Sequence, residues 1–331
     1  MSQATISQAA SARTRRAPRQ VSVRALRADE LPEAETIIRH AFGMWRQVPD
    51  LATYALDREY AWSRWQEDPH CAFAADVDGR LAGTSFGVRW GSVGFFGPLT
   101  VRPDLWGLGI GQHLVEPVVA RLLEQGVRHI GLYTFAESAK HVGLYRKFGF
   151  WPRFLTSYMT LPVVKENFPP EWSRYSEADE KQRSRHLEMC QALTAELYDG
   201  LDLRSAIRAV AAQGVGDTVF TWEGGRLAGF AVCRYGHRSE AGSGNCLVRF
   251  GAVCPGPNAA RHFDQLLDAC RWLAADAALS HLWVGINASR HHAYRQLLDR
   301  GFRTQIQGVT MHRPNDVGYD REDAFILDDW R

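Results

Sequence analysis

The feature that most constrains the fold of this chain is an internal repeat, because two similar segments are expected to adopt one fold twice. The pentapeptide GRLAG occurs at residues 79–83 and again at residues 225–229. A constant offset of 152 residues separates further identical pairs: Val101 and Val253, Pro103 and Pro255, Leu114 and Leu266, Gly149 and Gly301. The 331 residues suffice for two ordinary domains. We therefore predict two copies of one fold, at residues 21–161 and 183–312.

Each copy is predicted to mix strands and helices. Alternating apolar residues bounded by turn residues indicate strands, and apolar residues at a spacing of three to four indicate helices. The expected order in the first copy is strand 21–26, helices 30–42 and 54–66, strands 71–78, 80–90 and 94–101, helix 110–124, strand 129–135, helix 138–148 and strand 151–161. The second copy is expected to begin with two helices and continue with strands 218–222, 227–234 and 246–253, helix 258–275, strand 281–286, helix 289–300 and strand 304–312.

Three segments lie outside the two copies. Residues 1–20 carry four arginines, no acid and no apolar periodicity, which predicts a disordered basic tail, with a nucleic-acid-binding arm as the alternative. Residues 162–182 contain three prolines and are predicted to be a linker. Residues 313–331 carry six carboxylates and are predicted to form an acidic C-terminal tail.

Composition bounds the class of protein. The chain is 45% hydrophobic and 23% charged, as globular proteins are, and its formal net charge is +2. This balance favours neither a nucleic acid nor a membrane as partner, and no apolar run reaches the roughly 18 residues of a membrane span. Six scattered cysteines without a C-x-x-C pair predict reduced thiols in a cytoplasmic protein. The adjacent His291 and His292 would point in different directions on a helix, so no metal site is predicted there. A homodimer is one option for the oligomeric state.

A glycine-rich stretch at residues 101–117, VRPDLWGLGIGQHLVEP, is the strongest local signal for a binding site. A predicted strand ends at Val101, and Gly107, Gly109 and Gly111 lead into a predicted helix. The first N–H groups of a helix lack internal partners, and glycines let the backbone approach a phosphate closely. The stretch therefore predicts an anion site at the start of the helix. A tight strand-to-helix turn without a ligand is the alternative.

Two motifs in this order resemble the GNAT superfamily of acetyl-CoA-dependent N-acetyltransferases. The family pattern V-x-P-x-x-R/Q-x-x-G-x-G/A is followed, after one strand, by a helix that carries L-Y-x-x-x-G-F. The matching positions are Val101, Pro103, Gly109, Gly111, Leu144, Tyr145, Gly149 and Phe150. The resemblance covers residues 21–161 well and residues 183–312 in outline. It implies tandem α/β (α+β) domains, each a mixed, mostly antiparallel sheet flanked by helices.

The resemblance also implies that acetyl-CoA binds to the first copy. Its pyrophosphate would lie on the N–H groups of the glycine turn, and the preceding strand would offer N–H groups to the thioester carbonyl. The implied contact residues are Leu99, Thr100, Val101, Trp106, Gly107, Leu108, Gly109, Ile110, Gly111 and Gln112. Trp106 stands where the family has Arg or Gln, so binding is expected to be weakened rather than abolished. Its ring is expected to pack on the pantetheine or adenine, or else to be ordinary core.

Acetyl transfer to an amine needs a base for the amine and an acid for the departing thiolate. The resemblance implies that Tyr145 is the acid; packing in the core is its alternative role. His141 lies four residues earlier on the same helical face, with Ser138 three residues before it. An imidazole accepts protons near neutral pH, so His141 is the predicted base. Alternatively, this segment only begins the helix, with Ser138 as its N-cap.

The second copy departs from the motifs. At the offset of 152 residues the key positions change: Gly109 to Arg261, Gly111 to Phe263 and Tyr145 to Leu297. A phenylalanine side chain at the close-approach position would obstruct a phosphate. We therefore predict that the second copy binds no coenzyme A and acts structurally, or helps to shape the substrate cleft.

The resemblance also implies that the acceptor lies beside the helices predicted between residues 30 and 66. This stretch, residues 30–66, holds six aromatic residues: Phe42, Trp45, Tyr54, Tyr60, Trp62 and Trp65. They predict either a pocket for an apolar or aromatic amine or part of the core. The resulting hypothesis is an N-acetyltransferase that moves the acetyl group of acetyl-CoA to a primary amine of a small molecule or peptide, by direct attack in a ternary complex. The alternatives are a non-catalytic acyl-CoA sensor and an interaction scaffold that uses the charged tails.

Overall fold

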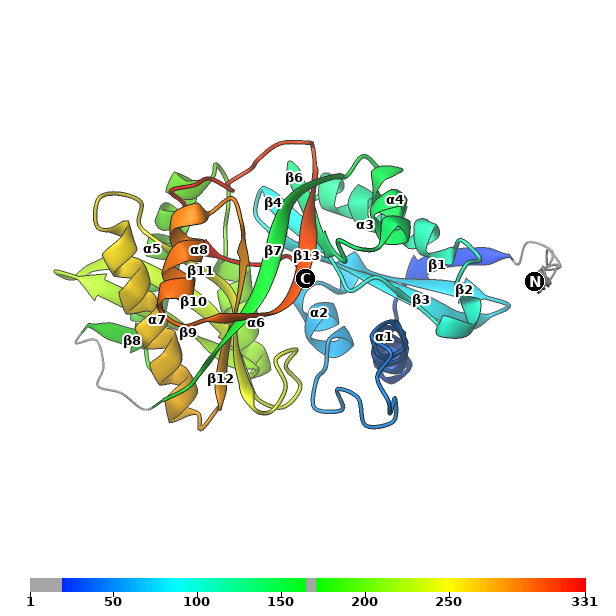
Figure 1. The fold of residues 1–331 in the computed structure, drawn as a ribbon, viewed down its shortest axis with the longest axis horizontal. Helices are drawn as coiled ribbons and strands as arrows, with labels where there is room; N and C mark the ends of the chain where they lie inside the picture. Colours follow the sequence, from blue (N-terminus) through cyan, green and yellow to red (C-terminus); the bar gives the residue numbers. More distant parts are fainter. Residues whose placement is uncertain (1–19, 165–170) are drawn as a thin grey trace, which may run out of the picture.

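The computed structural model describes residues 20–164 and 171–331 (Figure 1). The first copy contains, in order, β1 Val21–Ala25, η1 Ala28–Glu30, α1 Leu31–Trp45, α2 Ala61–Glu67, η2 Pro69–Cys71, β2 Ala72–Val77, β3 Arg80–Trp90, β4 Val93–Phe96, β5 Thr100–Val101, η3 Pro103–Leu105, α3 Ile110–Glu124, β6 His129–Thr134, α4 Ala139–Arg146 and β7 Trp151–Pro162. The second copy contains β8 Trp172–Arg174, α5 Glu180–Leu197, α6 Arg204–Gln213, β9 Gly216–Glu223, β10 Arg226–Arg234, β11 Asn245–Val253, α7 Ala259–Asp276, β12 His281–Asn287, α8 His291–Asp299, β13 Arg303–Arg313 and β14 Ile326–Leu327. The predicted basic tail, apart from its last residue, lies outside the described residues.

Two predicted elements of the first copy are shorter than expected. The helix predicted at 54–66 begins only at Ala61, because the N–H groups of Tyr60 and Ala61 donate to Oε2 of Glu35 on α1, both at 2.8 Å. This tertiary contact caps the helix where local pattern could not. The strand predicted at 94–101 divides into β4 and β5 around Gly97 and Pro98, since proline has no N–H for a ladder hydrogen bond.

The two copies share one sheet by exchanging their last strands. The strand order is β1-β2-β3-β4-β6-β13-β7-β12-β11-β10-β9-β8. β13, the last long strand of the second copy, pairs with β6 of the first copy, as in the contact of Val309 with Thr134. β7, the last strand of the first copy, pairs with β12 of the second, as in the contact of Leu161 with Leu282. The boundaries 21–161 and 183–312 therefore describe the two copies along the sequence. In space, each half of the molecule also contains the last long strand of the other copy (Figure 1).

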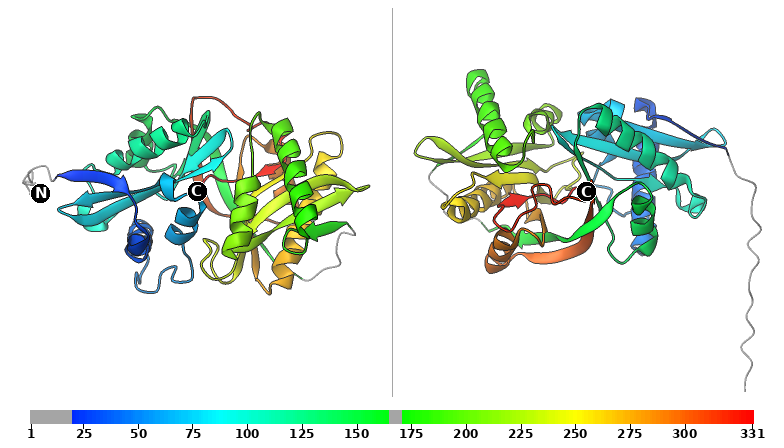
Figure 2. Two further views of the ribbon diagram at one scale, coloured as in Figure 1. Left: turned by 180° about the vertical axis from the view of Figure 1, so that it is seen from behind. Right: turned by 90° about the horizontal axis from the view of Figure 1, so that it is seen from above.

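The segment predicted as an acidic tail is an ordered part of the interior, so this prediction is wrong. Asp320 and Asp328 are buried and accept hydrogen bonds from Arg290, at 2.6 Å and 2.9 Å. The ring of buried Trp330 packs against Gly131 of β6, where a Cβ would collide with it. Buried carboxylates are tolerated because a buried guanidinium neutralises them. In Figure 2 the C-terminus accordingly lies between the two halves in both views.

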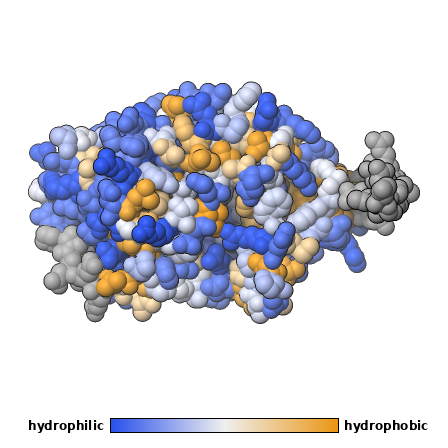
Figure 3. All heavy atoms as spheres, in the orientation of Figure 1, coloured by the Kyte–Doolittle hydropathy of each residue, from blue (hydrophilic) through white to orange (hydrophobic). Residues whose placement is uncertain are grey.

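The predicted linker also holds structure, because β8 pairs with β9 at the edge of the sheet. Buried polar contacts also join the halves: Arg64 on α2 forms an ion pair with Glu240 at 2.7 Å and donates to the main-chain oxygen of Arg331 at 2.5 Å. The surface in Figure 3 is mostly hydrophilic, with apolar residues in small separate groups. Within residues 20–164 and 171–331, no helix combines the length and apolarity that crossing a membrane requires.

Candidate active site

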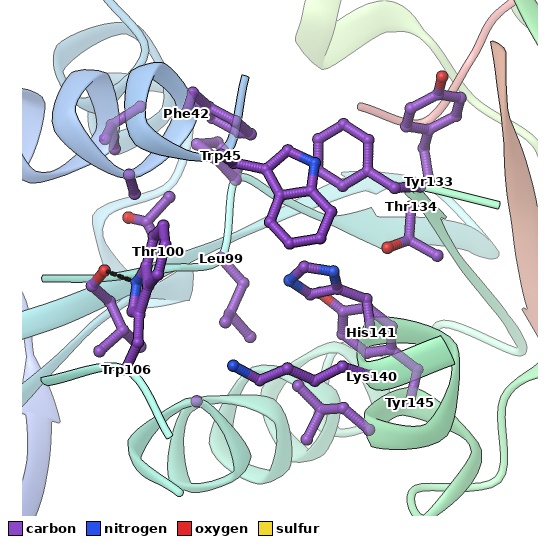
Figure 4. A pocket seen from close by; sticks show the side chains of 18 of the residues that line it. Phe42, Trp45, Leu99, Thr100, Trp106, Tyr133, Thr134, Lys140, His141 and Tyr145 are labelled. Carbon is purple, nitrogen blue, oxygen red and sulfur yellow. Dashed lines mark hydrogen bonds between the residues drawn. The ribbon is translucent and has the colours of Figure 1, made fainter. Parts of the chain in front are cut away.

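The candidate site lies where the sheet of the first half opens. β4 and β6 run parallel and pair from Val93 and His129 to Phe95 and Gly131, where their pairing ends. β5 instead continues along β3, so the two sides of the sheet diverge. A cavity of about 620 Å³ fills the opening and reaches from the glycine turn to α1, α4 and the last two residues of the chain (Figure 4).

The glycine turn presents a row of free N–H groups. Gly107 and Gly109 adopt φ angles of +83° and +80°, which only glycine adopts without strain, and Gly109 is the N-cap of the 15-residue helix α3. Within the described part of the chain, the N–H groups of residues 107–111 donate to no acceptor. Five adjacent free donors at the positive end of a helix form an anion-binding concavity. Gly111 does not have a positive φ angle, and a Cβ added there would only make ordinary van der Waals contact with Leu99.

Most of the predicted contact residues line this cavity. Those that do are Leu99, Thr100, Val101, Trp106, Gly107, Gly109, Ile110, Gly111 and Gln112. The side chain of Leu108 is half exposed and does not line the cavity, so only its backbone can contribute. The N–H of Arg102 donates to the main-chain oxygen of Ala82 on β3 at 2.8 Å. Because main-chain N–H and C=O groups alternate in direction along a strand, those of Leu99 point away from β3 and toward the cavity.

Trp106 is not a core residue. Its side chain is 38% exposed, and its indole N–H donates to the main-chain oxygen of Val101 at 2.7 Å. The hydrogen bond holds the ring beside the end of β5, on the cavity wall (Figure 4). Of the two expected positions for this ring, the structure excludes the core and leaves the ring where a bound ligand could contact it.

Tyr145 is buried but reaches the cavity. Its ring lies 5.9 Å from that of Phe96, and the residue lines the cavity. Burial raises the pKa of the Tyr145 hydroxyl above its usual value. The hydroxyl is therefore protonated at neutral pH and available as a donor, so both roles considered for Tyr145, core packing and acid, are structurally compatible.

His141 lies across the cavity from Leu99, between Trp45 and Tyr145 in the view of Figure 4. Its Nδ1 is 2.7 Å from Oγ of Ser138, and Ser138 is also the N-cap of α4. The ring packs edge-on against Trp45, with centroids 4.8 Å apart. Burial, together with the neighbouring Lys140 charge, lowers the pKa of His141. The imidazole is therefore neutral at pH 7 and able to accept a proton.

The predicted aromatic set divides into two groups. Phe42, Trp45, Tyr54 and Tyr60 line the cavity, whereas Trp62 and Trp65 pack against the core beneath α1 and α2. Four arginines that the sequence did not single out also line the cavity: Arg39 and Arg46 from α1 and its C-terminal end, Arg58 from the turn before α2, and Arg331 from the C-terminal segment. Arg331 could not be found from sequence, because its segment looked like a solvated tail.

The corresponding opening in the second half is filled by the chain itself. β14 pairs with β11 at Gly251 and Ala252, which follow Leu99 and Thr100 by 152 residues. Asp329, just beyond β14, lies against Gly285 of β12. β14 thus occupies the gap between β11 and β12.

The glycine positions of the second half are occupied as well. Phe263 is completely buried, with its ring 5.4 Å from that of Phe325, and Arg261 forms an ion pair with Glu223. This half therefore has no glycine turn comparable to that at residues 107–111. No cluster of three or more metal-ligating side chains occurs in the two described ranges of the chain.

Comparisons with known proteins agree with this geometry. Residues 34–150 match the model of the acetyltransferase (GNAT) family. A Pyrococcus horikoshii protein provisionally assigned as an acetyltransferase has a similar structure, with a TM-score of 0.64 and 14% identity over 94% of this chain and 95% of that one. A GCN5-related N-acetyltransferase from Sphaerobacter thermophilus gives a TM-score of 0.60 and 15% identity over 88% of this chain and 95% of that one.

A tandem GNAT protein from the clavulanic acid biosynthesis pathway is similar along its whole length. Its TM-score is 0.58, with 11% identity over 88% of this chain and 98% of that one. No curated protein matches the sequence significantly. The family match lies on the half with the open cavity, and the structural similarity extends over both halves. Residues 34–150 therefore match the acetyltransferase (GNAT) family, and the chain as a whole has the fold of a tandem GNAT protein.

Proposed function

We propose that the first half transfers an acetyl group from acetyl-CoA to a primary amine of a small molecule or peptide, by direct attack in a ternary complex. The observation that carries this proposal is the row of five free N–H groups at residues 107–111, placed beside an open sheet edge. The row suits a pyrophosphate. The main-chain groups of Leu99 suit an extended arm that contains amides, as pantetheine does.

The second half supports this placement of the arm. There, the extended segment β14 pairs with Gly251 and Ala252, the counterparts of Leu99 and Thr100. In the first half this edge lines the cavity, and no segment of residues 20–164 or 171–331 pairs with it. An extended ligand would therefore pair with β5 as β14 pairs with β11, with its thioester near α4.

Two side chains on α4 suit the proton transfers. The amine nitrogen attacks the thioester carbonyl carbon, the C–S bond breaks, and the thiolate takes a proton. The Tyr145 hydroxyl, kept protonated by burial, supplies that proton. When Nδ1–H of His141 donates to Ser138, the Nε2 lone pair is free to take the proton of the amine, directly or through water. Ser138 then acts as a positioning residue.

The test is calorimetric titration with acetyl-CoA, followed by a thiol-release assay over a set of amines. We expect one site per chain in the wild type and no binding in Gly109→Asp, where a carboxylate enters the anion site. Gly126→Asp is the matched control, because Gly126 has a φ of +83° just beyond the far end of α3 and nothing within 4 Å of a Cβ. Unchanged binding in Gly109→Asp would overturn the cofactor site.

The alternative is a non-catalytic acyl-CoA sensor, which uses the same cavity. It predicts acetyl-CoA binding without thiol release for any amine. The hydroxyl of Tyr145 separates the two proposals, because a sensor has no use for a proton donor at the departing sulfur.

A further inference from the structure

The cavity is strongly cationic. No aspartate or glutamate is among the lining residues described. Six lining side chains carry positive charge: Arg39, Arg46, Arg58, Lys140, Lys147 and Arg331. The phosphates of the cofactor would account for part of this charge. Lys140 extends toward the side of the cavity where Leu99 and Trp106 lie (Figure 4).

Arg58 and Arg331 form a separate group on the acceptor side, among tyrosines. The guanidinium of Arg331 lies 3.5 Å from the ring centroid of Tyr158, and Tyr60 interacts with both arginines. The hydroxyl of Tyr133 is buried here and has no hydrogen-bond partner among the residues that the structure describes. Two guanidinium groups beside phenol hydroxyls offer several donors to one small anion.

The charge of these two arginines is only partly balanced by the protein. Nε of Arg331 donates to Asp329 at 2.8 Å, but Asp329 also pairs with Arg249 at 3.4 Å. Arg58 is largely withdrawn from solvent, and it has no carboxylate within 4.0 Å in the part of the chain that the structure describes. A guanidinium held in this way, beside an open cavity, is suited to an anionic ligand.

We propose that the acceptor is an amine that also carries a carboxylate, and that Arg58 and Arg331 bind that carboxylate. This inference rests on the proposed acetyl transfer and names its substrate class. A neutral amine would bring no anion to these arginines. A carboxylate would pair with them in bidentate fashion while its amine points back toward Leu99. The surrounding positive charge also favours the uncharged form of the bound amine, which is the nucleophilic form.

The aromatic walls agree with a compact amino acid as acceptor. Phe42, Trp45 and Tyr54 provide apolar surface for a side chain, while the arginines hold the carboxylate. Binding then resembles most small-molecule sites, with apolar walls and a few polar groups that set orientation.

The test compares matched pairs of acceptors that differ only in the carboxylate. The twenty common amino acids and their carboxamides are offered with acetyl-CoA, and released thiol is measured. We expect at least one amino acid to react with a kcat/KM about tenfold or more above that of its amide, the effect of one charge-assisted contact. Arg58→Gln should remove about tenfold or more from kcat/KM for the acid, mainly through KM, and leave the amide within about twofold.

The control variant is Arg121→Gln, on the exposed face of α3, which should leave both rates unchanged. Equal kcat/KM values for the acids and their amides would overturn the carboxylate assignment, and so would the absence of thiol release with every acid. Either result would leave the acetyl-CoA site intact, because that site is judged separately by the titration of Gly109→Asp. Failure to bind acetyl-CoA at all would instead overturn the proposed function.

Discussion

Leu327 pairs with Gly251, whose counterpart in the first copy, 152 residues earlier, is Leu99. The same sheet edge is thus covered by the chain in one half and open to a cavity in the other. Two copies of one fold thus differ in whether this edge lines a cavity, without a change in topology. The pairing also ties the C-terminal segment to both halves, since Trp330 and Arg331 line the open cavity only a few residues beyond Leu327.

The first prediction concerns stoichiometry. Calorimetry should give one acetyl-CoA per chain, because β14 and Phe263 occupy the corresponding space in the second half. Arg261→Ala should leave both stoichiometry and affinity unchanged, since this arginine is already paired with Glu223. A stoichiometry of two, or loss of binding in Arg261→Ala, would contradict this account.

The second prediction concerns Tyr145. Tyr145→Phe keeps the buried ring beside Phe96 and removes only the hydroxyl. We expect kcat to fall by about 100-fold or more, as for loss of a general acid, while the affinity for acetyl-CoA stays within about twofold. Steady-state kinetics and titration measure the two effects separately. Undiminished kcat would assign the proton transfer to water or to another group.

The third prediction concerns the pH dependence of the rate. Because burial lowers the pKa of His141, the wild-type rate should rise with pH through a pKa below about 6.5 and then level off. His141→Ala should remove this limb of the profile and lower the plateau. Ser138→Ala should shift the limb, because Ser138 contacts Nδ1. A profile unchanged in His141→Ala would exclude His141 as the base.

The fourth prediction concerns acid stability at the junction of the halves. His312 on β13 is buried 3.1 Å from His129 on β6, with Asp320 at 3.4 Å and the ring of Trp330 beside it. Burial lowers the pKa of His312 to about 4. The imidazole takes up a proton near pH 6.5 in the unfolded chain, but only near pH 4 in the folded chain. Protonation therefore does not weaken the fold above about pH 6.5, and the free energy of unfolding falls as the pH decreases from there toward 4.

Between pH 7 and pH 5, His312 should therefore reduce the free energy of unfolding by about 2 kcal/mol. Urea unfolding at the two pH values measures the change. His312→Gln cannot take up the proton, so its stability should depend less steeply on pH than that of the wild type. Equal slopes for the two proteins would show that this histidine is not the titrating group.

The fifth prediction concerns the buried charges of the C-terminal segment. Arg290→Met would leave Asp320 and Asp328 buried without their cation. We expect a loss of about 3–5 kcal/mol in the free energy of unfolding, as when one partner of a buried ion pair is removed. Arg295→Met on the exposed face of α8 is the control and should change stability by less than about 0.5 kcal/mol.

Local sequence was sufficient wherever neighbours in the chain decide the structure. The helix predicted at 110–124 matches α3 at both ends, and the glycine turn before it has the positive φ angles that its composition indicated. His141 and Tyr145 share one face of α4 because a spacing of four residues is nearly one helical turn. The GNAT family could likewise be predicted, because its motifs lie on consecutive elements.

Long-range pairing decided the rest. The apolar pattern of β7 and β13 predicted strands but could not say that each would pair with the other copy, since both partners offer similar edges. The carboxylates of residues 313–331 looked solvated, and only the tertiary structure places Arg290 among them. By itself, then, the sequence determined two copies of the fold and one glycine turn, because short-range geometry sets these. Only the tertiary structure decided which groove stays open and which arginines line it, because those contacts join residues far apart in the chain.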